Sequence, residues 1–415
     1  MTTLQGALGG PRFAQLPPLS LYAHIPWCIR KCPYCDFNSH EQKGELPEAR
    51  YGDALIADLE ASLPDVWGRK LSTIFIGGGT PSLFAPAAID RLLTAVRTLM
   101  PLEFEAEVTM EANPGTFEAE RFAGYRAAGV NRLSVGVQSF DDERLAAIGR
   151  VHGAREARRA VESALSLYPT VNVDLMYALP GQSLEDALDD VRAAVELGVP
   201  HISAYHLTLE PNTYFHRFPP ALPDDESAAD MQERIEEVLA AAGYEHYETS
   251  AFARPGHRAR HNVNYWTFGD YLGIGAGAHG KLSFRDRVRR EARQRAPRAY
   301  MDAALSGNAV QEKNDVDAGS LPFEFLMNAL RLIEGFPAAL FAERTGLPIA
   351  VVERELQAAE RDGLIERDLA AIRPTLKGQR FLNELLERFL PDPPRERTKA
   401  GHPVNIAWLD TRRTS

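Results

Sequence analysis

The stretch Leu19-Ser-Leu-Tyr-Ala-His-Ile-Pro-Trp-Cys28-Ile-Arg-Lys-Cys32-Pro-Tyr-Cys35 carries an apolar run directly into three cysteines. The run Leu19–His24 has the composition of a buried β-strand. Because three is an odd number and the cysteines lie close together, they suit a metal site in a reducing compartment better than a disulfide framework. The stretch therefore predicts a metal centre at the end of the first strand.

Beyond this stretch, short apolar runs alternate with amphipathic runs whose apolar residues lie three and four positions apart. Such alternation is typical of parallel βα units. The expected strands are Leu19–His24, Thr73–Ile76, Glu105–Glu111, Arg132–Val137, Asn172–Met176 and His201–His206. The expected helices are Tyr51–Leu63, Ala87–Leu99, Phe117–Ala128, Ala154–Leu167 and Leu184–Leu197. We predict an α/β fold built on a partial (β/α)6 parallel barrel, with ligand chemistry at the carboxyl ends of its strands.

The pattern changes in the second half of the chain. A Gly-rich and aromatic stretch covers residues 244–280, and periodic Leu and Phe return at about residue 321. The helices expected in this half are Glu226–Ala241, Phe323–Ile333, Pro337–Thr345, Ile349–Asp362 and Lys377–Phe389. We expect an N-terminal tail (1–18), a partial-barrel domain (19–255), a connecting region (256–320), a smaller C-terminal helical, winged-helix-like domain (321–390) and a mobile tail (391–415).

Composition narrows the class of partner. The chain has 415 residues, a net charge of −11 and a pI near 5.6, which argues against nucleic acid, since phosphate contacts need clustered Lys and Arg. Residues 1–18 lack a basic segment followed by an apolar run, and no later run approaches the roughly 20 apolar residues of a membrane span. We therefore expect a cytoplasmic protein without an integral membrane span, which acts on a small molecule or a protein.

The cysteine spacing leaves two kinds of metal site open. A structural zinc ion prefers four protein ligands, and the nearby candidates for a fourth are His24, Asp36 and His40. A four-iron cluster on three thiolates keeps one iron without a protein ligand, and that iron can chelate the amino and carboxylate groups of a bound molecule. We favour the [4Fe-4S] cluster.

Polar or glycine-rich segments follow or end the next strands. Gly77-Gly78-Gly79-Thr80-Pro81 follows the second strand, and glycines there let the backbone approach a ligand closely, although an ordinary strand-to-helix turn also explains such a run. Glu111 ends the third strand, and a solvated strand end is the alternative interpretation. Gln138, Arg150 and Asp174 belong to the fourth and fifth units, where a structural polar network is the alternative.

The motif C-x3-C-x2-C, with Tyr34 before the last cysteine, resembles the radical SAM superfamily, whose members reduce S-adenosylmethionine at the open iron to release a 5′-deoxyadenosyl radical. The resemblance to its coproporphyrinogen-oxidase group covers about residues 19–390. It implies a [4Fe-4S] cluster on Cys28, Cys32 and Cys35. It also implies that S-adenosylmethionine is bound by Tyr22, Gly78, Gly79, Thr80, Glu111, Gln138, Arg150 and Asp174.

Within that group, the sequence departs from the oxygen-independent coproporphyrinogen III oxidases. Those enzymes carry a further cysteine two residues beyond the third, where this chain has Phe37, and they have a longer segment before the cluster than the 27 residues that precede Cys28. Several segments instead look like HemW-type heme chaperones. These segments are Ile25–Cys28, Cys35–His40, Met110–Gly115, His261–Trp266 and Tyr271–Gly280.

The segment His261-Asn262-Val-Asn-Tyr265 fits the H-N-x-x-Y element that the resemblance associates with heme. Imidazole is a competent axial ligand of heme iron. Apolar contacts could come from Trp266, Phe268 and Tyr271, and propionate contacts from Arg258 and Arg260. His257 and His279 are alternative ligands, and a loop histidine satisfied by local hydrogen bonds remains the simpler interpretation of His261.

Three functions are therefore open. The leading hypothesis is a heme chaperone that transfers heme to an acceptor protein, which the resemblance suggests is a respiratory-chain protein. The second is a radical enzyme that acts on a porphyrin, such as an oxygen-independent coproporphyrinogen III oxidase, and the third is a non-catalytic iron-sulfur scaffold. Phe37 disfavours the oxidase, and the H-N-x-x-Y element favours the chaperone.

Overall fold

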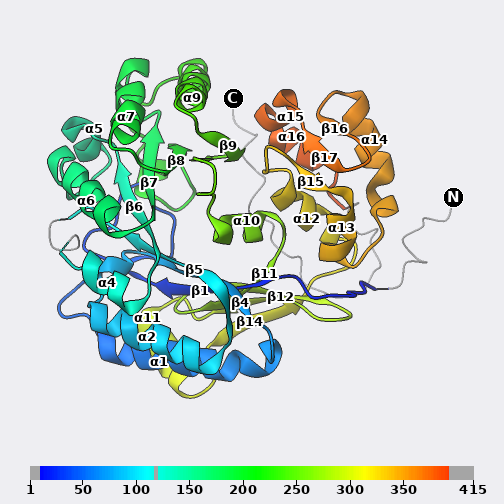
Figure 1. Ribbon diagram of the computed structural model, residues 1–415, viewed down its shortest axis with the longest axis horizontal. Coiled ribbons are helices and arrows are strands. Elements are labelled where there is room, and N and C mark those ends of the chain that lie inside the picture. The colour runs from blue at the N-terminus through cyan, green and yellow to red at the C-terminus, as the bar shows by residue number, and fades with distance from the viewer. Residues whose placement is uncertain (1–9, 116–119, 392–415) are drawn as a thin grey trace.

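A twelve-stranded sheet forms the centre of the computed structural model, which describes residues 10–115 and 120–391 (Figure 1). Six of its strands lie side by side and run parallel, and helices connect each of these strands to the next. They are β1 (Leu19–Ile25), β4 (Leu71–Gly78), β5 (Leu102–Ala112), β6 (Arg132–Gln138), β7 (Thr170–Tyr177) and β8 (His201–His206). These six strands form the expected partial barrel, and each one occurs where the sequence predicts it.

Helices cover the outer face of this barrel. They are α1 (Glu48–Val66), α2 (Pro86–Leu99), α4 (Phe122–Ala128), α5 (Asp142–Ala147), α6 (Ala154–Leu167), α7 (Leu184–Glu196) and α9 (Asp225–Ala241). The buried residues Ile89, Leu92, Leu93 and Val96 of α2 lie at helical spacing on one face, which explains why this segment packs on the sheet. The helix expected over Phe117–Ala128 begins at Phe122, and residues 116–119 lie outside the described part of the chain.

Short elements complete the barrel domain. β2 (Trp27–Cys28) and β3 (His40–Glu41) pair with each other, and the single turn η2 (Pro81–Leu83) follows β4. Beyond β8 come α8 (Tyr214–Arg217), β9 (Glu245–Glu248) and β10 (Ala251–Ala253), and β10 adds to β8 in antiparallel orientation. Each of these elements shapes the loops at the strand ends.

Residues 256–320 differ from the expected connecting region, because they belong to the central sheet. They form α10 (Arg260–Trp266), β11 (Asp270–Ile274), β12 (His279–Ser283), β13 (Val288–Arg293), α11 (Pro297–Leu305) and β14 (Val310–Asp315). β11 pairs in parallel with β1, and the next three strands continue the sheet in antiparallel order. Their charged side chains hid the apolar alternation that marks a strand, as in Val288-Arg-Arg-Glu-Ala-Arg293.

The C-terminal unit has its own core and lies beside the barrel, in orange and red in Figure 1. It comprises α12 (Leu321–Ala329), β15 (Phe336–Pro337), α13 (Ala338–Thr345), η3 (Ile349–Val352), α14 (Glu353–Arg361), β16 (Ile365–Arg367), β17 (Ala371–Pro374), α15 (Leu376–Arg380) and α16 (Leu382–Glu387). The three short strands form one antiparallel sheet among the helices, which agrees with a winged-helix-like unit. The helix expected over Lys377–Phe389 is divided at Phe381.

In residues 10–115 and 120–391, no helix combines the length and apolar character that crossing a membrane requires. The expected tail 391–415 falls almost wholly outside the described residues.

A buried ion pair fixes the strands that extend the sheet beyond β1. The fully buried carboxylate of Asp270 lies 3.0 Å from Lys281 Nζ and 2.8 Å from Arg69 Nη1, and it accepts hydrogen bonds from the backbone and hydroxyl of Ser283. All of these partners lie on β11, on β12 or just before β4. The pair therefore ties three neighbouring segments together in a region that sequence patterns did not reveal.

We expect Asp270→Asn to lower the free energy of unfolding by about 3–5 kcal/mol, because it leaves buried cationic groups without their counter-charge. Asp302→Asn, which removes an exposed partner of Arg50, is the matched control and should cost less than about 1 kcal/mol. Denaturant unfolding of both variants measures the difference. Equal small losses would show that the buried pair does not hold this edge of the sheet.

Candidate cluster and cofactor site

The three cysteines lie on one loop at the carboxyl end of β1. The loop leaves β1 through Trp27–Cys28 and returns at His40–Glu41, so its two ends are held side by side. Asn38 anchors its middle, since its side-chain amide donates to the carbonyl oxygens of Ala276 and Arg295, each at 2.9 Å. The thiols are unpaired and partly buried. The loop therefore presents three free thiols from a fixed backbone.

Arg150 supplies positive charge to this loop. Its Nη1 donates to Cys32 Sγ at 3.6 Å, while its Nη2 donates to Asn113 Oδ1 at 2.8 Å and to the carbonyl of Gly136 at 2.6 Å. Burial raises the pKa of the Cys28 and Cys35 thiols. A nearby guanidinium favours the thiolate form that metal ligation needs.

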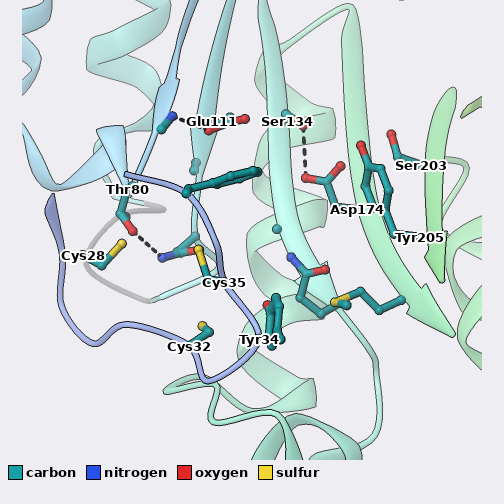
Figure 2. Close-up of a pocket in the computed structure, with 18 of the residues that line it drawn as sticks. Cys28, Cys32, Tyr34, Cys35, Thr80, Glu111, Ser134, Asp174, Ser203 and Tyr205 are labelled. Atoms are coloured by element: carbon teal, nitrogen blue, oxygen red, sulfur yellow. Dashed lines mark hydrogen bonds between the residues drawn. The ribbon is translucent and has the colours of Figure 1, made fainter. Parts of the chain in front are cut away.

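A cavity of about 530 Å³ opens beside the cysteine loop and follows the inner face of the parallel strands (Figure 2). Ten of the residues predicted for the cluster and S-adenosylmethionine line it. They are Cys28, Cys32, Cys35, Gly78, Gly79, Thr80, Glu111, Gln138, Arg150 and Asp174. Tyr22, which was also predicted, is absent from this lining, and its hydroxyl contacts His24 Nδ1 at 2.9 Å.

The glycine run at the end of β4 contributes Gly78 and Gly79 to the cavity lining and also packs against protein. A Cβ atom on Gly79 would lie 2.5 Å from the carbonyl oxygen of Trp27, and one on Gly78 would lie 2.5 Å from the ring of His24. Gly78 also has a φ of +118°, which other residues rarely adopt. The run is therefore required for the close contact between the β4 loop and the cysteine loop.

Two buried carboxyl groups give the cavity its electrostatic character. Glu111 Oε2 accepts the backbone N–H of Gly78 at 2.9 Å, and burial, together with the charge of Asp174, raises the pKa of Glu111 to about 8. Burial also raises the pKa of Asp174, which accepts hydrogen bonds from Asn172 at 2.8 Å and Ser134 at 3.2 Å. Two acids in one desolvated cavity favour a cationic ligand.

Sequence patterns missed several residues of the cavity. Asn113 joins the β4 loop to the cysteine loop, because its amide donates to Thr80 Oγ1 at 2.9 Å while its oxygen accepts from Arg150. Arg132, Ser134 and Tyr205 also line the cavity. The signal for Asn113 was its place two residues after Glu111 at a strand end, whereas the others lie inside strands and have no such signal.

The H-N-x-x-Y residues do not converge on one site. His261 Nδ1 lies 3.1 Å from Thr73 Oγ1, its ring packs on Phe75 at 4.8 Å between centroids, and burial lowers its pKa to about 3. Asn262 lines the cavity, whereas Tyr265 is 37% exposed. The helix α10 that carries them lies near the centre of the molecule, against the amino half of the barrel (Figure 1).

The other residues considered for heme also have protein partners. Arg258 pairs with Glu245 and Glu334, and Arg260 pairs with Glu103. His257 Nδ1 lies 3.1 Å from Thr170 Oγ1, and His279 is exposed on β12. A heme pocket built from these side chains would require some of these contacts to open.

Comparison with known proteins identifies relatives over nearly the whole chain. Residues 22–194 match the family model of the radical SAM superfamily, and residues 317–381 match that of the HemN C-terminal domain. The chain is 51% identical over 378 residues to heme chaperone HemW of Escherichia coli (strain K12), covering 91% of this chain and 99% of that protein. It is 34% identical over 381 residues to the bovine mitochondrial radical S-adenosyl methionine domain-containing protein 1, covering 88% and 86%.

Among solved structures, coproporphyrinogen III oxidase (HemN) from Escherichia coli, a radical SAM enzyme, superposes with a TM-score of 0.77. The alignment covers 90% of each chain at 24% identity. At this identity the likeness establishes the shared fold, and it leaves the activity to be argued from the site.

We expect Gly79→Ala to reduce the iron bound after reconstitution as well as the stability of the protein, by about 1–3 kcal/mol, because the added methyl group pushes on the backbone next to Cys28. Gly52→Ala is the matched control, since its Cβ would meet Arg91 at an ordinary distance of 3.7 Å. Iron content and denaturant unfolding provide the two measurements. Full iron content in Gly79→Ala would show that the two loops can separate without harm to the cluster site.

Proposed function

Because this chain belongs to the HemW family of the radical SAM superfamily, we propose that it is a heme chaperone that binds heme and transfers it to an acceptor protein, and that it carries a [4Fe-4S] cluster and S-adenosylmethionine. The observation that carries the proposal is the 51% identity to a heme chaperone over 99% of that protein's length. The geometry of the cavity independently supports the part of the proposal that concerns the cluster and S-adenosylmethionine.

The donor set fits the cluster. Cys28, Cys32 and Cys35 would hold three irons, and the guanidinium of Arg150 places a positive charge beside Cys32 Sγ. Of the three candidate fourth ligands of a closed zinc site, His24 is engaged with Tyr22 and with the carbonyl of Asn38, whereas His40 Nε2 is buried without a hydrogen-bond partner among the described residues. The preference for the cluster therefore rests on the match to the radical SAM family.

The cavity also fits S-adenosylmethionine, which is cationic at its sulfonium and amino groups. Glu111 and Asp174 would face these charges, and Thr80, Gln138 and Arg150 would provide further polar contacts. When bound, cluster and cofactor supply reductive radical chemistry. The residues of this chain bind and orient the ligand and exclude water from it.

For heme, we propose His261 as the axial ligand, with Asn262 and Tyr265 nearby. Its low pKa keeps the imidazole neutral, and the contact between Nδ1 and Thr73 orients the ring and leaves Nε2 for iron. Ligation requires α10 to shift from its present place, because the ring packs on Phe75. The acceptors, by family resemblance, are respiratory-chain proteins, and the site of action is the cytoplasm.

The alternative function is radical chemistry on a porphyrin, such as that of coproporphyrinogen III oxidase. Phe37 argues against it. This residue lines the cavity mouth and is 58% exposed, at the position where those oxidases carry a further cysteine.

Affinity for S-adenosylmethionine should rise with pH. Because the pKa of Glu111 is about 8 in the free protein, a cationic ligand must displace its proton below that pH, and affinity should increase up to tenfold per pH unit before it levels off above pH 8. Glu111→Gln should bind more weakly by about 1.5–3 kcal/mol and lose this pH dependence. Equilibrium dialysis between pH 6.5 and 9 on anaerobically reconstituted protein measures the affinity of the wild type and of Glu111→Gln.

Glu105→Gln, on the exposed start of β5, is the control and should behave like the wild type. An unchanged pH profile in Glu111→Gln would refute the role of Glu111 in binding S-adenosylmethionine.

Heme titration separates chaperone from oxidase. We expect the reconstituted protein to bind heme and to form no protoporphyrinogen IX from coproporphyrinogen III in the presence of reductant and S-adenosylmethionine. His261→Ala should bind heme more weakly, with a shifted Soret band and full iron content, because it removes an axial ligand and spares the cluster.

His279→Ala, at an exposed position, is the control for this titration. If His261→Ala showed the Soret band of the wild type, His257 or His279 would become the better candidate for the axial ligand. If protoporphyrinogen IX formed at a rate tied to cleavage of S-adenosylmethionine, the chaperone function would be refuted and the oxidase function would take its place.

A further inference from the structure

Arg132, the first residue of β6, is a buried arginine whose charge interacts with that of Asp174 in the same cavity without a direct ion pair between them. It is 3% exposed, its Nε is buried without a hydrogen-bond partner, and within residues 10–115 and 120–391 its guanidinium forms neither an ion pair nor a hydrogen bond. The side chain lines the cavity described above. A buried, unpaired charge is costly, and proteins retain such costs mainly at functional sites.

Arg132 lies at the opposite end of the cavity from the cysteines. Along β6, Arg132, Ser134, Gly136 and Gln138 line the cavity in turn, as the alternation of a strand requires. Gln138 lies six positions beyond Arg132, so the two ends of this row lie at most about 20 Å apart at the usual rise of a strand, since β6 is irregular between Val135 and Gln138. A ligand group held at the cluster cannot also meet Arg132. In Figure 2, Ser134 likewise lies away from the cysteine loop, beside Asp174.

The acids nearest to Arg132 in the sheet are engaged elsewhere. Glu107 accepts the backbone N–H groups of Arg260 and His261, each at 3.1 Å. Asp174 accepts from Asn172 and Ser134. Thr109, the register partner of Arg132 on β5, also has a buried hydroxyl without a hydrogen-bond partner. Two unsatisfied buried groups therefore lie side by side on adjacent strands.

Asn262 brings a further polar group to this end. It lines the same cavity from α10, which is anchored to Glu107 and Thr73 in the layer next to Thr109 and Arg132. Burial, and secondarily the charge of Arg132, lowers the pKa of the neighbouring His261. The amino end of the cavity thus combines a planar guanidinium with an amide.

We propose that Arg132 and Asn262 form a carboxylate-binding subsite at the amino end of the cavity, distinct from the cluster end. The planar guanidinium matches two carboxylate oxygens, and an amide N–H adds a third donor. The carboxylate belongs either to a free small organic acid or to a propionate of heme. The second source rests on the proposed heme function, since α10 carries both Asn262 and the proposed axial ligand His261.

The test uses the reconstituted full-length protein and two probes. Succinate is titrated at constant ionic strength, with the melting temperature as readout, and inorganic phosphate serves as the comparison anion. Heme and its dimethyl ester, which lacks free propionates, are titrated by absorbance. The variants are Arg132→Met and Asn262→Ala, and Arg155→Met on the exposed face of α6 is the matched control.

For the wild type and for Arg155→Met we expect one of two responses. Either succinate raises the melting temperature, or heme binds more tightly than its dimethyl ester. Arg132→Met should weaken that binding at least tenfold, and Asn262→Ala should weaken it by a smaller factor. Without ligand, Arg132→Met should melt at the same or a higher temperature, because it removes an unpaired charge. A response to succinate identifies a free acid, and a difference between heme and ester identifies the propionate.

Four results would overturn the subsite. One is the absence of both responses in the wild type. Another is an equal response in Arg132→Met. A third is a response to phosphate that exceeds the response to succinate. The last is a large loss of stability in ligand-free Arg132→Met, which would make the arginine structural. Failure of heme to bind the wild type at all would refute the chaperone function and leave the succinate result to decide the subsite.

Discussion

The backbone of the glycine loop holds the cysteine loop in place. Gly79 N donates to the carbonyl of Ile25 at 2.8 Å, and Thr80 N donates to the carbonyl of Trp27 at 2.7 Å. Both bonds depend on the absence of a side chain at Gly79, and they continue the parallel pairing of β1 and β4 beyond the ends of the strands. The position of Cys28, and with it the position of the three thiols over the cavity, follows from this contact between two backbones.

Buried charged groups form ion pairs in the extension of the sheet but not in the cavity. In the extension of the sheet, Asp270 faces Lys281 and Arg69, and Asp58 faces Arg293 and the hydroxyl of Tyr300, so each buried charge is matched inside the protein. In the cavity, Glu111, Asp174 and Arg132 form no ion pair with any described residue, although the charges of Arg132 and Asp174 interact. Structural networks neutralise themselves, whereas a site that binds charged ligands leaves its charges for them.

Much of the site could be predicted from local sequence, because its residues lie at the ends of apolar strands. The six parallel strands and the cysteine motif show simple periodicity and spacing, and ten predicted residues line one cavity. The strands β11 to β14 could not be recognised, since charged residues interrupt their apolar pattern and one of them, Arg293, is buried through Asp58, a partner distant in the chain. The packing role of Gly79 was equally hidden, because it depends on a contact with Trp27 across the fold.

If His261 ligates heme as proposed, the position of α10 would make heme binding and cofactor binding interdependent. The backbone of His261 is bonded to Glu107 on β5, its ring contacts Thr73 and Phe75 on β4, and the next residue, Asn262, forms part of the cavity wall. Glu111 and the glycine loop lie at the other ends of those two strands. A shift of α10 that frees the His261 ring for iron must therefore also move the wall of the cofactor cavity. By thermodynamic linkage, the factor by which heme changes the affinity for the cofactor equals the factor by which the cofactor changes the affinity for heme. On the proposed function, α10 would serve both ligands and would thereby let the state of the cofactor cavity set the affinity for heme.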